Sequence, residues 1–158
     1  MVDKQTVRIP SGDVPAVPTF DVDVADGWVA VTAPGAVARL SDERHPTRSI
    51  TVTSLRVDDE TGLRDVAVRS FARQRQAHPS AEIRAQRTGR FGDRLVYLRE
   101  VAIGGTTPVA QLQAMFLIES GPARDAFSFV GTAPVGELDE FGPVFVDVVA
   151  SFREADPA

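Results

Sequence analysis

The chain has 158 residues, of which 43% are hydrophobic and 25% charged, and its formal net charge is −5. A chain of this length is typical of one soluble domain and buries enough surface to fold without covalent or metal cross-links. It contains no cysteine, which excludes disulfides, thiolate metal sites and cysteine nucleophiles. The acidic balance argues against general nucleic-acid binding.

The N-terminal segment gives an expectation about location. Residues 1–20 contain no apolar stretch of the length that a signal peptide needs, and there is no cysteine that could be lipidated. No segment approaches the ~20 apolar residues of a membrane span. The sequence therefore predicts a cytoplasmic protein without a transmembrane helix.

The first third of the chain has the pattern of successive strands. Three prolines confine residues 1–18 to a short strand at 6–9 followed by an extended arm. Over residues 20–24 apolar side chains alternate with two aspartates, which predicts a half-buried strand with its charges facing solvent. Short strands are expected at 28–33 and 36–40, and the β-branched segment 50–57 predicts a central strand.

The next segment predicts an amphipathic helix. Asp59 or Thr61 is expected to accept hydrogen bonds from N–H groups of the first turn, and the neighbouring acids suit the positive end of the helix dipole. From Leu63 to Ala77 apolar residues recur at three- and four-residue spacing, opposite a face with four arginines. Pro79 ends the helix.

The centre of the sheet is expected in a hairpin over residues 93–120, where two long apolar strands flank a Gly-Gly pair at 104–105. A two-residue loop would place Tyr97 and Arg99 on the same face as Leu112. A loop of three or five residues pairs apolar positions with apolar ones, so we favour that register. It leaves a mixed face that bears Tyr97, Arg99, Gln111 and Gln113.

The remaining elements complete an α+β fold. The polar segment 81–91 predicts an edge strand, 126–132 predicts a further strand, and apolar residues at helical spacing predict a last helix over 138–152. Pro143 is tolerated in that helix only in or near the first turn. Residues 154–158 are expected to fray. The order of strands, helix, strands and helix predicts one domain over 1–158 with an antiparallel sheet.

A scattered set of features resembles the PsbP-like fold, which is also named after the yeast Ran-binding protein Mog. The features are Phe20 with Gly27-Trp28, the strand SITVTSL before the first helix, Gly92 before a strand pair with Gln113 and Phe116, AFSFVGTAP, and a closing helix that ends in ASFR. Within that fold the sequence is most similar to the actinobacterial LpqN-type lipoproteins and the DcrB-like proteins.

This resemblance implies an α/β/α sandwich, in which helices flank both faces of an antiparallel sheet of about six strands. Proteins with the fold generally look like non-catalytic adaptors that bind a GTPase, a photosystem, a secretion effector or a lipid transporter. The chain is expected to depart from the LpqN pattern, because residues 1–20 contain no apolar stretch of signal-peptide length and the sequence contains no cysteine to lipidate. The resemblance therefore does not extend to membrane anchoring.

No stretch contains a recognisable catalytic or cofactor motif. His45 and His78 have no evident carboxylate or nucleophile partner and are interpreted as surface residues. The acids at 58–60 lack the spacing of a calcium loop, and a divalent-ion site at Asp21 and Asp23 is weighed against a solvated face. The glycines at 104–105 lie between strands, not before a helix, and so form no phosphate loop. We expect no enzyme activity, no cofactor and no metal.

Five residues remain as candidates for binding. Tyr97, Arg99, Gln111 and Gln113 qualify for partner contact if no helix covers their face. Trp28 follows a turn, where it is either a partner-binding aromatic or a side chain that packs one end of the core.

Two hypotheses about function follow. The first is a non-enzymatic module that binds another protein. The second is a carrier or chaperone that holds an apolar ligand or segment between sheet and helices, and it requires an apolar cavity of several hundred Å³.

Overall fold

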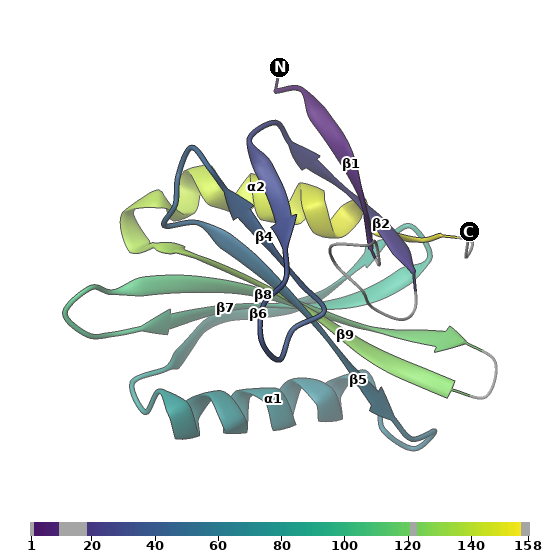
Figure 1. The fold of residues 1–158 in the computed structure, drawn as a ribbon. Helices are drawn as coiled ribbons and strands as arrows, with labels where there is room; N and C mark the ends of the chain where they lie inside the picture. The colour runs from purple at the N-terminus through teal and green to yellow at the C-terminus, as the bar shows by residue number, and fades with distance from the viewer. Residues whose placement is uncertain (1, 10–18, 121–122, 156–158) are drawn as a thin grey trace.

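The computed structural model describes residues 2–9, 19–120 and 123–155, and Figure 1 shows their arrangement. Seven strands form one antiparallel sheet in the order β3-β4-β5-β9-β8-β7-β6, and three more form a second sheet in the order β1-β2-β10. The strands are β1 (Lys4–Ile9), β2 (Phe20–Ala25), β3 (Trp28–Val31), β4 (Ala38–Asp42), β5 (Ser49–Val57), β6 (Glu82–Phe91), β7 (Arg94–Ile103), β8 (Val109–Ser120), β9 (Ala123–Pro134) and β10 (Arg153–Glu154). The helices are α1 (Leu63–Ala77) and α2 (Leu138–Ala150), and α2 follows the 3-10 turn η1 (Val135–Glu137).

The layers are those of an α/β/α sandwich. In Figure 1 helix α1 lies along one side of the large sheet, and α2 lies on the other side together with β1 and β2. The large sheet has seven strands where about six were predicted, since β3, β4 and β5 all join it and the N-terminal strands form a sheet of their own. No helix in the described part of the chain is long and apolar enough to cross a membrane.

The main core lies between the large sheet and the layer of α2 and β2. Its largest side chains, each no more than 1% exposed, are Phe20, Phe116, Phe127, Phe129, Phe141 and Phe145. Phe116 stacks on Phe127 with ring centroids 5.8 Å apart, and Phe152 packs against both rings. The alternation of apolar residues in the strands thus produces one aromatic face that α2 covers.

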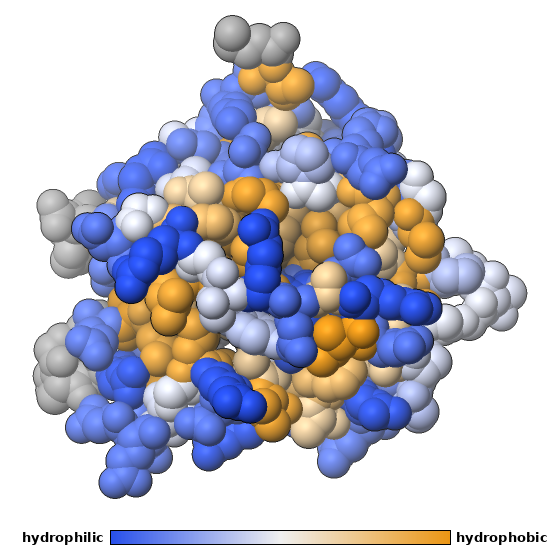
Figure 2. Space-filling view, turned by 180° about the vertical axis from the view of Figure 1, so that it is seen from behind, coloured by the Kyte–Doolittle hydropathy of each residue, from blue (hydrophilic) through white to orange (hydrophobic). Residues whose placement is uncertain are grey.

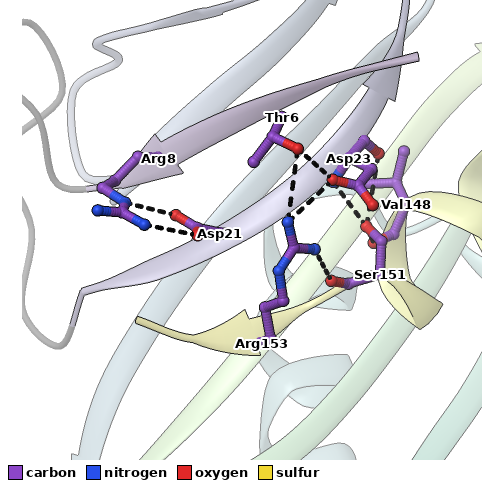
Figure 3. Close-up of polar contacts among 7 residues, drawn as sticks. All are labelled: Thr6, Arg8, Asp21, Asp23, Val148, Ser151 and Arg153. Atoms are coloured by element: carbon purple, nitrogen blue, oxygen red, sulfur yellow. Dashed lines mark hydrogen bonds and ion pairs between the residues drawn. The ribbon is translucent and has the colours of Figure 1, made fainter. Parts of the chain in front are cut away.

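The aspartates of β2 tie the two ends of the described chain to the second sheet, as Figure 3 shows. Arg8 donates two hydrogen bonds to the Asp21 carboxylate, at 2.8 and 3.0 Å. Asp23 accepts from Thr6 at 2.7 Å and from Arg153 at 3.1 Å. The predicted solvated face is therefore wrong for Asp21, which is only 7% exposed, whereas the Asp23 side chain remains 36% exposed although neighbouring strands hold its carboxylate. Sequence periodicity cannot show such partners.

Helix α1 has the predicted bounds but a different start. Its N-cap is Gly62, whose backbone N–H donates to Asp65 Oδ2 at 3.0 Å. Neither Asp59 nor Thr61 is the cap. Instead, Asp58 Oδ1 accepts from the backbone N–H and the hydroxyl of Thr61, both at 2.8 Å, and these bonds lower the pKa of Asp58. An aspartate turn therefore precedes the helix.

The C-terminal part differs from prediction in two places. Pro143 lies in the second turn of α2, one turn later than expected, but it is exposed, so water can hydrogen-bond the carbonyl that Pro143 leaves without an N–H partner. Glu154, expected to fray, belongs to β10 and pairs with Phe20 of β2. The predicted arm at 10–18 and the tail at 156–158 lie outside the described residues.

Candidate functional site

The register of the central hairpin confirms the odd-length loop. Residues 104–108 connect β7 to β8, so the loop has five residues. Arg99 lies opposite Gln113, and Leu98 lies opposite Ala114. Tyr97, Arg99, Gln111 and Gln113 therefore share one face of the sheet, and the apolar positions between them face the main core.

Helix α1 covers much of this mixed face. Arg99 Nη1 donates to the Ala67 carbonyl at 2.8 Å, and Arg99 Nη2 donates to Ser70 Oγ at 3.1 Å. Arg99 Nε donates to Gln113 Oε1 at 2.6 Å. Only 4% of Arg99 and 5% of Gln113 is exposed. The condition for partner contact, a face without a covering helix, is not met at these two residues.

Three glutamines extend the hydrogen bonding between helix and sheet. Gln74 Nε2 donates to Gln111 Oε1 at 2.6 Å, and Gln113 Nε2 donates to Gln74 Oε1 at 2.9 Å. The sequence placed Gln111 and Gln113 on this face but did not identify Ser70 and Gln74 as their partners. The available signal was that Ser70 and Gln74 are the polar members of an otherwise apolar helical stripe, four residues apart.

The electrostatics of Arg99 are unusual for a buried cation. No ion pair joins it to a carboxylate among the described residues, and its guanidinium lies 5.1 Å from the Phe71 ring and 5.7 Å from the Tyr97 ring. Burial lowers the pKa of Arg99, and Tyr97 partly offsets that effect. The group still remains charged at neutral pH, because arginine ordinarily titrates far above neutrality.

The other two candidates have different surroundings. Tyr97 is half-buried, and its hydroxyl donates to the Gln86 side chain of β6. Trp28 is 3% exposed and stacks on Phe141 with ring centroids 6.3 Å apart. Of the two interpretations of Trp28, the core-packing one fits this position, while Tyr97 remains accessible.

Two of the hollows beside α1 contain the candidate residues of the mixed face. The first, which we call the α1 groove, has a volume of about 500 Å³ and is lined by residues that include Leu63, Arg64, Val68, Gln86, Leu95 and Tyr97. Val68 and Leu95 are 62% and 46% exposed, so the groove presents apolar surface to solvent. The second, which we call the polar pocket, has a volume of about 200 Å³ and is lined by residues that include Thr53, Ser70, Gln74, Arg99, Gln111 and Ser128.

Charge is distributed unevenly along the chain. Residues 62–92 contain seven arginines and two acids, a formal charge of +5. The rest of the chain has 10 basic and 20 acidic residues, a formal charge of −10. All seven arginines are exposed: Arg64, Arg69, Arg73 and Arg75 on α1, and Arg84, Arg87 and Arg90 on β6. Arg87 lies opposite Leu98 and therefore faces the α2 side of the sheet, whereas the arginines of α1 lie on the other side. The set thus borders the outer edge of β6 from both sides, and we call it the basic surface.

Strand β6 is the outermost strand of the large sheet, as predicted, and most of its residues are exposed. An outermost strand presents backbone N–H and C=O groups that can pair with a further strand. Residues of α1 and β6 together line the α1 groove. Figure 2 shows one face of the molecule, on which strongly hydrophilic side chains cross between apolar patches.

The described residues were also considered as metal ligands and as acid–base catalysts. No group of three or more His, Asp or Glu side chains in that part of the chain could hold a metal ion. His45, expected to lack a carboxylate partner, in fact has Nδ1 2.9 Å from Asp42 Oδ2. Asp42 also accepts from the Arg44 backbone N–H at 2.9 Å, which identifies the contact as part of a turn.

Comparison with known proteins yields matches among solved structures only. No protein-family model matches the chain, and no curated protein matches it. The cyanobacterial PsbP of Synechocystis sp. PCC 6803 is similar with a TM-score of 0.72 and 15% identity, over 98% of this chain and 94% of that one. LpqN of Mycobacterium tuberculosis, which is involved in cell envelope biogenesis, has a TM-score of 0.70 and 15% identity, over 97% and 92%.

A third similar structure comes from a eukaryote. The Ran-binding protein Mog1p of Saccharomyces cerevisiae has a TM-score of 0.68 and 11% identity, and the similarity covers 99% of this chain and 97% of that one. At these identities the likeness is one of fold. The fold that the sequence resembles is thereby confirmed: the chain has the PsbP-like fold, with LpqN and Mog1p among its structural neighbours.

Proposed function

We propose that the protein is a non-enzymatic accessory module that binds another protein through the basic surface, the α1 groove and the open edge of β6. The observation on which the proposal depends is the separation of charge. Residues 62–92 have a formal charge of +5 and seven exposed arginines, in a chain whose other residues sum to −10, and this favours a partner with an acidic segment.

The local geometry suits an extended segment. The outer edge of β6 can add a strand by backbone hydrogen bonds, and the flanking arginines can pair with carboxylates of that strand. Beside it, the α1 groove offers Val68, Leu95 and Tyr97 as apolar contacts. Exposed apolar surface of this kind is typical of interaction sites. Tyr97 is the one residue of the predicted mixed face that we assign to this contact.

The fold similarity supports the same class of function. One of the structural neighbours, Mog1p, is a Ran-binding protein, so this architecture serves protein recognition in at least one case. Fold alone does not choose a partner. The acidic character of the proposed partner therefore depends on the charges of this chain.

A carrier of an apolar ligand remains the second candidate, and the α1 groove is the observation in its favour. Its volume of about 500 Å³ falls within the range of small-molecule sites. Polar side chains such as Arg64 and Gln86 share the lining, which suits a protein surface better than a wholly apolar ligand.

A pair of matched charge reversals tests the proposal. Arg87 in β6 and Arg39 in β4 are both exposed strand arginines, and neither is part of an ion pair found among the described residues. Tagged wild-type, Arg87→Glu and Arg39→Glu proteins would be used for affinity capture from the native cell, followed by mass spectrometry. We expect a protein that the wild type and Arg39→Glu retain and that Arg87→Glu loses, with salt-sensitive binding.

Other outcomes would contradict the proposal. Equal capture by all three proteins would show that the basic surface is not the contact. Recovery of nucleic acid, or of a small apolar molecule without a protein, would replace the proposal by nucleic-acid binding or by the carrier.

A further inference from the structure

We propose that the polar pocket beside α1 is a binding site for a small oxyanion, a carboxylate or a phosphate group, and that Arg99 is its cation. This inference is independent of the protein-binding function, since the pocket lies beside Ser70 and Gln74 and shares no lining residue with the α1 groove.

The first argument comes from two buried arginines of the same chain. The side chain of Arg48 is 5% exposed, and its Nη2 lies 2.8 Å from Glu137 Oε1 and 3.2 Å from Glu140 Oε2. Arg99 is 4% exposed, yet its described hydrogen-bond acceptors are all neutral: the Gln113 amide, the Ala67 carbonyl and the Ser70 hydroxyl. Buried charges in proteins are normally paired with an opposite charge. A bound anion would give Arg99 the negatively charged partner that Arg48 already has in Glu137 and Glu140.

The second argument is the chemistry of the lining. Thr53 and Ser128 contribute hydroxyl groups, and Gln74 and Gln111 contribute amides, while the Ser70 hydroxyl and the Gln113 amide already donate to Ala67 and to the other two glutamines. Hydroxyls and amide NH₂ groups can donate to an oxyanion, and a guanidinium binds carboxylate and phosphate through short, charge-assisted hydrogen bonds. No acidic side chain is among the described residues of the lining. A metal cation would meet Arg99 at close range and would find no carboxylate to bind it.

The third argument is size and access. The pocket has a volume of about 200 Å³, several times the ~30 Å³ that a water molecule occupies in the liquid. It therefore has room for a carboxylate or phosphate group. Thr53 and Ser128 are only half-buried, so a ligand can enter beside α1 without displacing the helix. The remainder of a larger molecule would extend outward past β5 and β9.

An NMR titration of the whole protein tests the site. Resonances of the Arg99 Nε–H group and of the Gln74, Gln111 and Gln113 side-chain amides would be followed during addition of sodium phosphate, of sodium acetate, and of sodium chloride at matched ionic strength. We expect saturable shifts with phosphate, acetate or both, and no saturable shift with chloride. No saturable shift with either oxyanion would overturn the proposal.

Two arginine variants make the test specific. Arg99→Met removes the charge at similar length and should abolish the saturable shifts of the glutamine amides. Arg39→Gln removes an exposed arginine of β4 that neither lines the pocket nor belongs to the basic surface, and this variant should titrate like the wild type. Saturable shifts that persist unchanged in Arg99→Met would place the anion elsewhere and contradict the inference.

If Arg99→Met does not fold, two smaller changes serve instead. Thr53→Val and Ser128→Ala each remove a hydroxyl from the lining and leave the Arg99 hydrogen bonds in place. Loss of a hydrogen bond to a charged ligand should weaken the affinity by about tenfold. Wild-type affinity in both variants would show that the polar pocket is not the site. These results stand apart from capture by Arg87→Glu, so the two proposals can fail separately.

Discussion

Gly131 of β9 lies directly beneath Phe145 of α2, so close that a Cβ atom at position 131 would come within 2.6 Å of Phe145 Cδ2. Ring atoms of Phe141 would lie only 2.8 Å from the same point. The absence of a side chain at Gly131 therefore allows both aromatic rings of the helix to rest on the sheet backbone. This contact fixes the distance between α2 and the centre of the main core.

Gly131→Ala should consequently destabilise the fold. An added methyl group must push two fully buried rings out of place, and overpacking of this kind costs about 1–3 kcal/mol. The measurement is the free energy of unfolding from urea denaturation. Gly89→Ala in β6 is the matched control, because a Cβ there meets nothing within 4 Å. A similar unfolding free energy for the two variants would show that α2 adjusts without cost.

The carboxylates of β2 predict how stability depends on pH. The hydrogen bond from Arg8 lowers the pKa of Asp21, and the bonds from Thr6 and Arg153 lower the pKa of Asp23. A lowered pKa means that the folded state binds protons less readily than the unfolded chain. The resulting stabilisation is complete above the ordinary aspartate value of about 3.9 and is lost as the pH falls through the folded values.

Asp21→Asn should therefore lower stability at neutral pH and reduce the loss on acidification. The free energy of unfolding would be measured from roughly pH 6 to pH 2 for the wild type and the variant. Asp26→Asn changes an exposed aspartate next to the same strand and serves as control. If Asp21→Asn and the wild type lost stability in parallel over this range, the pairing with Arg8 would have no part in acid unfolding.

The two helices should differ in local stability. In α1 only Ala67 is buried, whereas α2 buries Phe141, Phe145, Val148 and Val149. Since each buried large apolar side chain contributes about 1.5–3 kcal/mol, α1 can open without unfolding the rest. Hydrogen exchange should show α1 amides exchanging at least about tenfold faster than α2 amides. Equal protection in both helices would mean that α1 opens only by global unfolding.

The sequence was sufficient where the spacing of apolar residues alone decides the register of a strand or the bounds of a helix. The register of the central hairpin follows from matching Val96 and Leu98 with Leu112 and Ala114, because a slip by one residue would expose a full apolar set. The bounds of α1 follow in the same way from helical spacing. The resemblance to the PsbP-like fold also depended on the order of strands and helices along the chain, and the structure has that order.

Contacts between distant segments could not be predicted. Asp23 and Arg153 are 130 residues apart, so alternation placed that aspartate on an exposed face but could not reveal its partner. The polar stripe positions Ser70 and Gln74 could not be matched to Arg99 and Gln113 until helix and sheet were placed together. The four arginines of the α1 face were evident from helical spacing, but the position of the β6 arginines relative to them could not be predicted until helix and edge strand were placed together.

The order of the elements has a consequence for synthesis on the ribosome. All seven strands of the large sheet, including those that carry Phe116, Phe127 and Phe129, end by residue 134, but α2 and Phe152, which cover these rings, come from residues 138–152. A nascent chain that stops before this segment exposes a wide aromatic face. Such surfaces promote aggregation of incomplete chains. Premature stop codons just after β9 should therefore yield insoluble fragments, although these fragments contain all seven strands of the large sheet.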